Sequence, residues 1–537
     1  MPAMTDLVSD DMSCAAEIGF SAPERYNASE ILFRNLDAGR ANKVAIYAMS
    51  GNVTYGELCI EAARFGNGLK SLGLKPGDRV VMFLNDTPRY PAAYFGAVRA
   101  GFVPILCNTL SNVELVRFYI EDSGASVAVV EGEYAHLFEA AVVSGTSLRS
   151  LVLVNGASTV HAAVEVNDAA KWLAGFSPDL TPADTHRDDM AFWMYSSGST
   201  GKPKGIVHLQ HDMAYTMESY GRRVLGIRED DICFSVPKIF FAYGFGNSIT
   251  FPFSLGASAV LHAGRPDAAA VLDCVERFKP TLFFGLPTLY NALLGHPRAA
   301  SADFGSVRLC LSAAEVLSQE LFDGWKERFG LEIMEGLGST EVLHIYLSNT
   351  VDQKKVGTAG KRVPGYDIRL TYPDGQPVPR GESGIMWVRG GSNAPTYWNR
   401  PDKTEQTMRD GWIWTGDLLV EDEAGFYTFS GRVDDLIKVS GQWVYPLEIE
   451  LTLFEHEAVR ECAVLGLEMP DRRMTLKAFV VLEDGHTACA EMTAALQGYV
   501  KSKLLPYKYP RIIDYVDVLP KTGTGKIDRQ ELKGRGI

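Results

Sequence analysis

The stretch that decides the fold class is Tyr195-Ser196-Ser197-Gly198-Ser199-Thr200-Gly201-Lys202-Pro203-Lys204-Gly205, which follows the apolar run Ala191 to Met194. Its glycines let the backbone approach an anion closely, while hydroxyls, amide N–H groups and lysines supply donors and positive charge. We therefore expect Ser196 to Lys202 and Lys204 to bind phosphate. The stretch is not a Walker A loop, which needs glycine at Ser196 and serine or threonine at Pro203. A flexible surface turn is the alternative interpretation.

Short apolar runs alternate with helix-like segments along the first three quarters of the chain. Runs that are apolar at consecutive positions suit strands covered on both faces, and their alternation with helical patterns predicts parallel, doubly wound α/β layers. The runs are Val80 to Leu84, Val127 to Val130, Leu151 to Val154, Thr281 to Phe284 and Val307 to Leu311.

The pattern changes after about Glu382 to short, aromatic segments punctuated by glycine, which predict antiparallel strands. The charged stretch Gly431 to Asp435 follows, and beyond it comes a compact region with strands and helices of its own. About 100 residues suffice for an independent α+β domain. We therefore predict two domains, a large α/β domain over 1–433 and a small α+β domain over 434–537.

Composition excludes several classes of protein. The 537 residues carry 52 Lys+Arg against 66 Asp+Glu, a net charge of −14, whereas nucleic-acid binders present a basic surface. The 8 cysteines include no C-x-x-C pair, so neither a disulfide framework nor a zinc site is expected, and a reducing cytoplasm fits them. The N-terminus lacks the basic segment of a signal peptide. The uncharged stretch 239–264 is interrupted by glycines and a proline, so we expect no membrane partner.

The Tyr195–Gly205 loop resembles the signature of the adenylate-forming superfamily of acyl-CoA synthetases, nonribosomal adenylation domains and luciferases. Further motifs of that superfamily follow in the right order: Gly338-Ser339-Thr340-Glu341, Thr415-Gly416-Asp417, a hinge-like Gly431 to Gly441, and Pro520-Lys521-Thr522-Gly523-Thr524-Gly525-Lys526. Taken singly, Thr415 to Asp417 suits a hairpin turn, Glu341 an acid in the first turn of a helix, and Lys526 a solvated lysine near the terminus. Their joint order favours the functional interpretation.

The resemblance implies a fold and a set of roles. The large domain should contain doubly wound subdomains and a distorted β-barrel, and the small domain should be mobile. Lys526 would be the catalytic lysine, Thr340 would touch phosphate, Glu341 would hold Mg²⁺, and the chain would rotate about Asp434. Asp417 and Arg432 would bind ribose. Adenine would be bordered by Ala313, Ala314, Glu315, Glu335, Gly336 and Leu337, and the coenzyme A tunnel by Lys438, Ser440 and Gly441.

The nearest subfamily is that of benzoate-CoA ligases and related aryl-CoA ligases. Phe240 to Asn247, Gly338 to Ile345 and Leu505 to Pro510 carry this resemblance. It implies an aromatic-acid pocket built from Phe241, Ala242, Tyr243, Gly338, His344 and Ile345. An ordinary core is the alternative for the aromatic run. Ala314 departs from the subfamily, which has glycine there, and its methyl group would narrow the site.

We therefore expect an ATP-dependent ligase that forms an aryl-CoA thioester through an acyl-AMP intermediate, with ATP, Mg²⁺ and coenzyme A as cofactors. The expected partners are a small aromatic carboxylate and, in the resemblance, a lysine acetyltransferase and deacetylase acting on Lys526; a homodimer is a candidate assembly. One alternative is a ligase for an alicyclic or short aliphatic acid. Others are an adenylation protein that loads a carrier protein and a non-catalytic nucleotide sensor.

Overall fold

The computed structural model describes residues 12–143, 145–156, 164–196, 203–439, 442–469, 474–505, 507–521 and 527–535. By packing, the chain forms two compact units. Unit 1 contains Met1–Ile368, Trp387–Trp414 and Ala424–Tyr427, and unit 2 contains Arg369–Met386, Thr415–Glu423 and Thr428–Ile537. This division differs from the predicted boundary at 433/434. The packing of the residues does not show where the chain rotates, so the boundary at 433/434 stays a prediction.

A seven-stranded sheet forms the first layer of unit 1, in the order β7-β6-β5-β3-β4-β8-β9. Neighbouring strands are parallel except for the antiparallel pair β8 and β9. Every residue of β4, β5 and β6 is buried, as the apolar runs predict. The strands are β3 (Arg79–Phe83), β4 (Val103–Leu106), β5 (Val127–Glu131), β6 (Ser150–Val154), β7 (Glu165–Asp168), β8 (Met190–Ser196) and β9 (Lys204–Leu209).

A nine-stranded sheet forms the second layer of unit 1, in the order β16-β15-β14-β13-β12-β10-β11-β1-β2. Its central strands are parallel, and β2, β15 and β16 pair antiparallel at the two edges. The strands are β1 (Val44–Ala48), β2 (Val53–Thr54), β10 (Ile232–Ser235), β11 (Ser258–Leu261), β12 (Leu282–Gly285), β13 (Leu309–Ala313), β14 (Ile333–Gly338), β15 (Ile345–Ser348) and β16 (Lys361–Arg362).

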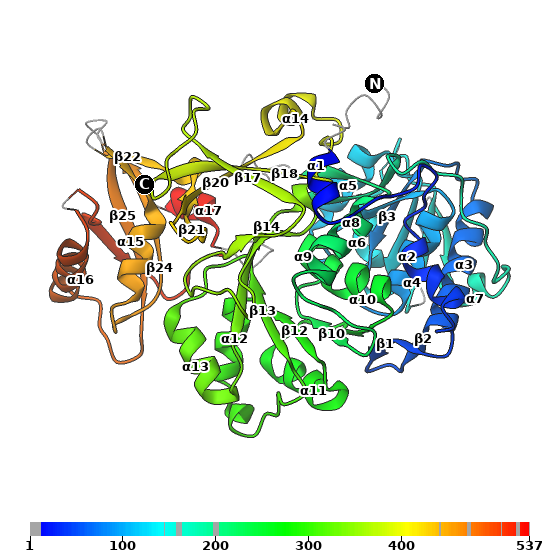
Figure 1. Cartoon of the computed structure of the whole chain (residues 1–537), viewed down its shortest axis with the longest axis horizontal. Coiled ribbons are helices and arrows are strands. Elements are labelled where there is room, and N and C mark those ends of the chain that lie inside the picture. Colours follow the sequence, from blue (N-terminus) through cyan, green and yellow to red (C-terminus); the bar gives the residue numbers. More distant parts are fainter. Residues whose placement is uncertain are drawn as a thin grey trace. The chain divides into compact units, whose positions relative to one another are not determined.

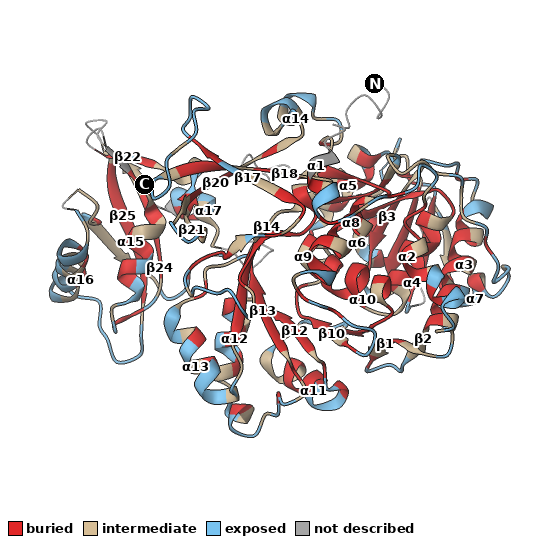
Figure 2. Cartoon of the chain, viewed as in Figure 1, coloured by how far each residue is buried: buried red, intermediate tan, exposed pale blue. Residues whose placement is uncertain are grey.

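Amphipathic helices cover the two sheets, and side-chain caps fix where several of them begin. Asp267 caps α11 (Ala268–Phe278) and Ser318 caps α13 (Gln319–Phe329), each accepting a backbone N–H of the first turn. Figure 1 shows these helices beside β12 and β13, and Figure 2 shows the strands buried and the outer turns of α13 exposed. The expectation of doubly wound α/β layers is confirmed.

The remaining helices of unit 1 are short, with the exception of α3. They are α1 (Met12–Glu17), α2 (Glu30–Asp37), α3 (Tyr55–Ser71), α4 (Arg89–Arg99), α5 (Val113–Ser123), α6 (Ala135–Ala141), α7 (Ala169–Leu173), α8 (Asp212–Thr216), α9 (Ala242–Phe245), α10 (Phe251–Leu255), α12 (Pro287–Leu294) and α14 (Pro401–Thr407).

A five-stranded sheet follows, as the glycine-punctuated sequence predicts. Its order is β17-β18-β20-β19, with β21 also paired to β20, which makes an open half-barrel. The strands are β17 (Tyr366–Thr371), β18 (Ser383–Gly390), β19 (Met408–Arg409), β20 (Trp412–Glu421) and β21 (Tyr427–Arg432).

The C-terminal part of unit 2 has the predicted α+β character. A three-stranded sheet, β24-β25-β26, packs with helices around a core that includes Ile449, Val464, Val480 and Leu496. Its elements are β22 (Ile437–Val439), β23 (Gln442–Val444), α15 (Pro446–Phe454), β24 (Val459–Glu468), β25 (Met474–Leu482), α16 (Ala490–Lys503), β26 (Ile512–Tyr515) and α17 (Arg529–Arg535). Within the described residues, no helix is both long and apolar enough to cross a membrane.

Candidate functional site

The predicted phosphate loop joins two antiparallel strands. Ser196, the last residue of β8, pairs with Lys204, the first residue of β9. Ser197, Gly198, Ser199, Thr200, Gly201 and Lys202 lie outside the described residues. Tyr195 anchors the first strand, because its hydroxyl donates to the buried Asp122 carboxylate at 2.8 Å. The loop therefore starts and ends on a paired, anchored hairpin.

Thr340 and Glu341 lie in a short 3₁₀ turn, Thr340–Val342, between β14 and β15. Each carbonyl of this turn accepts a hydrogen bond from another part of unit 1. His208 Nε2 lies 2.8 Å from the carbonyl oxygen of Thr340. The Ala394 amide donates to the carbonyl oxygen of Glu341 at 2.8 Å, and the Ser392 hydroxyl donates to the carbonyl oxygen of Val342 at 2.8 Å. The turn is therefore fixed from several sides, unlike the free first turn of a helix.

Tyr397 brings two predicted site residues together. Its hydroxyl donates to the Glu341 carboxylate at 2.8 Å, and the Lys204 ammonium lies 4.6 Å from the centroid of its ring. The contact depends on backbone pairing between Ile206 and Tyr397, far apart in the chain. The sequence analysis missed Tyr397, because nothing in its local pattern marks it as more than a core aromatic residue.

The residues predicted to border adenine lie at the carboxyl ends of two neighbouring parallel strands. Ser312 on β13 pairs with Glu335 on β14, and Ala313 pairs with Gly336. Ligands of open α/β sheets bind outside the carboxyl ends of the strands. Leu337 continues β14, while Ala314 and Glu315 continue the chain directly after β13. The structure therefore gathers this predicted set at one sheet edge.

Glu335 is a buried acid with an unusual pKa. Its side chain accepts the Leu317 amide at 3.3 Å, while the second carboxyl oxygen is buried with no partner among the described residues. Burial raises its pKa from 4.5 to about 8. Near neutral pH the group is mainly a carboxylic acid and can donate a hydrogen bond.

Three of the residues predicted to surround the acyl group, Gly338, His344 and Ile345, lie on the β14–β15 hairpin. Gly338 pairs with Ile345, and a Cβ atom on Gly338 would lie 2.5 Å from the His344 oxygen, so only glycine fits. The His344 ring lies 5.6 Å from the ring of Tyr243, and its Nε2 faces the Tyr243 oxygen at 3.3 Å. Ala242 precedes Tyr243 at the start of α9.

Phe241 and His344 differ in their surroundings. The Phe241 ring lies 4.6 Å from the ring of Phe240, tilted by 60°, and is partly buried against the main core cluster, so Phe241 serves the core as well as any pocket. Burial lowers the pKa of His344 to about 3, which leaves its ring neutral. Its Nδ1 has no partner among the described residues.

Asn247 is a polar residue that the sequence analysis left unassigned. Both atoms of its side-chain amide are buried without a partner among the described residues, and so is the Tyr243 hydroxyl. Burial raises the pKa of Tyr243, and the Asn247 side chain opposes that rise. The four-residue spacing of Tyr243 and Asn247 was the available signal, because it puts both on one helical face.

The predicted ribose residues meet within unit 2. An oxygen of Asp417 lies 2.5 Å from one terminal guanidinium nitrogen of Arg432, and the other terminal nitrogen donates to the Thr415 carbonyl oxygen at 3.1 Å. Thr415 to Asp417 lie inside β20, with Gly416 at φ 72°, so the hairpin-turn alternative is wrong. Arg432 and Asp417 can together hold two adjacent hydroxyl groups.

The remaining predicted residues fall at the surface of unit 2 or outside the description. Asp434 is exposed in the 3₁₀ turn Val433–Asp435, and Lys438 is exposed on β22. Ser440, Gly441 and Lys526 lie outside the described residues.

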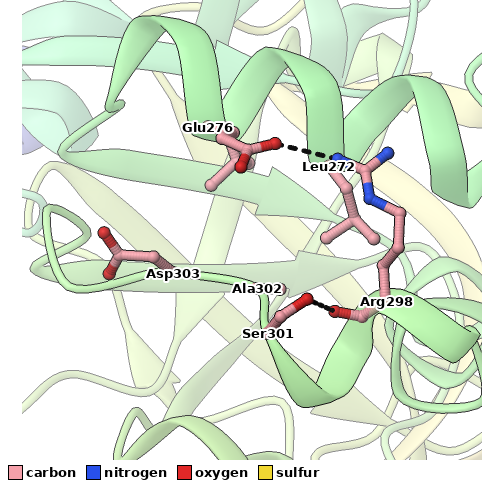
Figure 3. A pocket seen from close by; sticks show the side chains of 7 residues that line it. Leu272, Glu276, Arg298, Ser301, Ala302 and Asp303 are labelled. Atoms are coloured by element: carbon pink, nitrogen blue, oxygen red, sulfur yellow. Dashed lines mark hydrogen bonds and ion pairs between the residues drawn. The ribbon is translucent and has the colours of Figure 1, made fainter.

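Two further observations concern other ligands. Figure 3 shows a small depression beside α11 in which Arg298 bonds to Glu276 at 2.9 Å; it contains none of the predicted residues.

Over the described ranges, no group of three or more His, Cys, Asp or Glu side chains could hold a metal ion. A single carboxylate such as Glu341 suits Mg²⁺, which takes most of its ligands from substrate phosphates and water.

Comparison with known proteins identifies the family of the chain. The model of the AMP-binding enzyme family matches residues 33–398, and that of the AMP-binding enzyme C-terminal domain matches 448–526. Benzoate–CoA ligase from Thauera aromatica is 44% identical over 95% of this chain and 96% of its own.

Solved structures give the same result. The anthranilate CoA ligase AuaEII in complex with anthranoyl-AMP has a TM-score of 0.89 and 36% identity, covering 96% of this chain and 98% of its own. A benzoate CoA ligase from Burkholderia xenovorans LB400 has a TM-score of 0.86 and 38% identity, covering 95% and 100%.

Ala314 has a strained backbone, with φ at 72°, and replacing it by glycine should relieve the strain. A left-handed conformation costs a residue with a Cβ about 1–2 kcal/mol, and glycine costs about 0.5–1 kcal/mol more entropy on folding. Ala314→Gly should therefore leave stability unchanged or raise it by up to about 1 kcal/mol in denaturant unfolding. Ala313→Gly, in the extended strand, is the control and should destabilise. Equal losses in both variants would contradict strain at Ala314.

Glu335 should make the stability of unit 1 depend on pH. Its pKa is raised from 4.5 to about 8, so between these values the folded state holds a proton that the unfolded state has released. Raising the pH through this window therefore lowers stability, by up to about 1.4 kcal/mol per pH unit. Glu335→Gln should remove this slope. Urea unfolding of both proteins at about pH 5.5 and about pH 7.5 measures how the free energy of unfolding changes with pH. Equal changes in the two proteins would show that Glu335 is not a neutral acid in the folded state.

Proposed function

Because the chain belongs to the AMP-binding enzyme family, we propose that it joins benzoate or a substituted benzoate to coenzyme A, through an acyl-AMP intermediate and with release of pyrophosphate and AMP. One observation carries this proposal. Gly338, His344 and Ile345 of the acyl pocket lie on the same β14–β15 hairpin as Thr340 and Glu341. The ring of the acid and the reacting phosphate would thus be held by neighbouring residues.

The first half-reaction must turn a poor electrophile into a good one. The substrate carboxylate attacks the α-phosphorus of ATP and expels pyrophosphate, so negative charge builds up on the phosphate oxygens. Ser196 to Lys202, Lys204 and Thr340 would hold these oxygens, with Lys526 bridging the carboxylate and the α-phosphate. Mg²⁺, held by Glu341, would neutralise part of the phosphate charge. Catalysis by this chain is then chiefly positioning and electrostatic stabilisation.

The nucleoside would be held by two sets of residues. Asp417 and Arg432 would hold the ribose hydroxyls, and Ala313 to Glu315 with Glu335 to Leu337 would border the adenine. In the second half-reaction the thiol of coenzyme A attacks the acyl-adenylate and displaces AMP. Lys438, Ser440 and Gly441 would then line the coenzyme A tunnel, after a rotation about Asp434.

The acyl pocket favours a planar ring over a long chain. Ala242, Ile345 and the glycine edge at Gly338 give apolar walls, and Tyr243 and the buried, neutral His344 close them. Asn247 and the Tyr243 hydroxyl add polar atoms without partners among the described residues. A small polar substituent on the ring can therefore be tolerated.

A panel of acids tests the proposal. Pyrophosphate release and thioester formation with free coenzyme A should be fastest with benzoate, 2-aminobenzoate or 4-hydroxybenzoate, slower with cyclohexanecarboxylate and far slower with octanoate. An apolar pocket discriminates by only about 1–3 kcal/mol per methylene, so the small benzoates should lie within a modest range of one another. Octanoate as the best substrate would disprove the aryl assignment. Acyl-AMP without thioester would favour an adenylation protein, and no pyrophosphate with any acid would favour a nucleotide sensor.

Lys526 should serve adenylation alone. Removing one preorganised donor costs about 10²–10³ in rate, so Lys526→Ala should lose at least that much acyl-AMP formation. Thioester formation from supplied acyl-AMP should largely survive, and Lys521→Ala in the same loop is the control. Acetylation of Lys526 should imitate the loss and deacylation should reverse it, because the modification removes the charge. A fully active preparation with stoichiometric acetyl-Lys526 by mass spectrometry would contradict this role.

Asp434 should be needed for the second half-reaction. Asp434→Pro fixes φ near −65° and restricts Val433 as well, so the chain should be held in one conformation. If that conformation is the adenylating one, acyl-AMP formation persists while thioester formation slows sharply. Asp435→Ala is the control, since it alters charge without fixing φ. Single-turnover measurements of acyl-AMP formation and of thioester formation test this prediction. Unchanged rates for both steps would show that the chain does not rotate about Asp434.

We also propose a reducing compartment such as the cytoplasm. All eight cysteines are free thiols, and seven of them are buried. A homodimer stays a prediction, which light scattering on the purified protein can test.

A further inference from the structure

His208 is a fully buried histidine on β9 that the reaction as described does not use. Its side chain and that of Asp212 are both 0% exposed. The ring stacks on Phe192 with centroids 5.3 Å apart. Its Nδ1 lies 2.8 Å from an oxygen of Asp212, and its Nε2 lies 2.8 Å from the Thr340 carbonyl oxygen. Both ring nitrogens are therefore in hydrogen bonds.

Both of these partners are acceptors. A backbone carbonyl can only accept, and the same Asp212 oxygen already accepts the Leu209 amide at 3.0 Å. With Asp212 as a carboxylate, each ring nitrogen must carry a hydrogen, which makes the ring an imidazolium with Asp212 as its counter-charge. Buried charges occur in such pairs. The other titratable groups that face Asp212 are His211, whose Nε2 lies 3.4 Å from the second Asp212 oxygen, and the buried hydroxyls of Tyr94 and Tyr366. A charged donor makes a stronger and more directional bond to Thr340 than a neutral one.

The bond to Thr340 joins the two large sheets at the candidate site. His208 lies on β9, which begins at Lys204 and pairs with β8 in the seven-stranded sheet. Thr340 follows β14 of the nine-stranded sheet. We propose that His208, charged and held by Asp212, is a positioning residue for adenylation: it sets the Thr340–Glu341 turn relative to β9, which begins at Lys204. This inference rests on the proposed function.

A matched pair of variants isolates the bond to Thr340. The amide nitrogen of glutamine reaches the position of Nε2, and that of asparagine the position of Nδ1. His208→Gln therefore keeps a donor for Thr340 and loses the one for Asp212, while His208→Asn does the reverse. Both remove the charge and both leave Asp212 without its cation, so their losses of stability should be similar.

The two variants should differ in catalysis. A misplacement of about 1 Å costs up to about 10²-fold in rate, so His208→Asn should lower kcat for acyl-AMP formation by about 10–100-fold. KM for the aromatic acid should change little, because the acyl pocket is not involved. His208→Gln should recover most of the rate. Equal rates in the two variants, or a loss that follows thermal stability alone, would overturn the proposal.

A spectroscopic measurement on the unmodified protein stands even if a variant fails to fold. Long-range ¹⁵N–¹H NMR spectra of the ¹⁵N-histidine-labelled protein should show both nitrogens of His208 protonated, and Asp212→Asn should convert the ring to a neutral tautomer. A ring nitrogen of His208 that carries no hydrogen in the unmodified protein would overturn the proposal that His208 is charged. If the unmodified protein activates no acid at all, the proposed function is wrong. The NMR measurement tests the protonation of His208 whether or not the protein activates an acid.

Discussion

The hydrogen bond between His208 and the Thr340 carbonyl is the constraint on which the candidate site depends. It ties the edge of the seven-stranded sheet to the turn that ends β14 in the nine-stranded sheet. Tyr397 repeats the link with side chains, since it bonds Glu341 while lying against Lys204. Donors that are already in place need no reorganisation when charge develops, which is where electrostatic catalysis gains most. The two sheets therefore supply rigidity, and the short segments between them supply the chemistry.

Charged and neutral groups are separated along the site. Lys204, Glu341 and the Arg432–Asp417 pair are charged groups, and they come from the segments predicted to hold phosphate, metal and ribose. His344 and Glu335, in the segments predicted to hold the acid and the adenine, are driven to their neutral forms by burial. A neutral ring and a neutral base do not need counter-charges, whereas a phosphate does. The burial pattern thus suits a reaction whose charge changes occur at the carboxylate and the phosphates and not at the aromatic ring or the adenine.

Much of this organisation could be predicted from the sequence, because it is encoded locally. The fully buried strands appear as unbroken apolar runs, and the anion loop as a run of glycine, hydroxyl and lysine residues. His208 and Tyr397 could not be found in this way. Each is an ordinary residue for its element, and its role comes from a partner far away in the chain, as with His208 and Thr340, which are 132 positions apart. Asn247 was within reach, because Tyr243 lies only four positions before it. Thr415 to Asp417 was ambiguous because glycine suits both a turn and an irregular strand; only the pairing of β20 decides.

Two residues of the candidate site have a side chain and a positive φ, and their surroundings differ. Ala314, at the end of β13, and Leu343, directly after the Thr340–Val342 turn, both have φ at 72°. Each costs about 1–2 kcal/mol that the surrounding fold must offset. Leu343 is buried against the main core and cannot relax without moving His344 and the turn. Ala314 is exposed, and nothing above it holds its methyl group in place. The strain at Leu343 is therefore locked in by its packing, whereas the strain at the exposed Ala314 is one that glycine would remove.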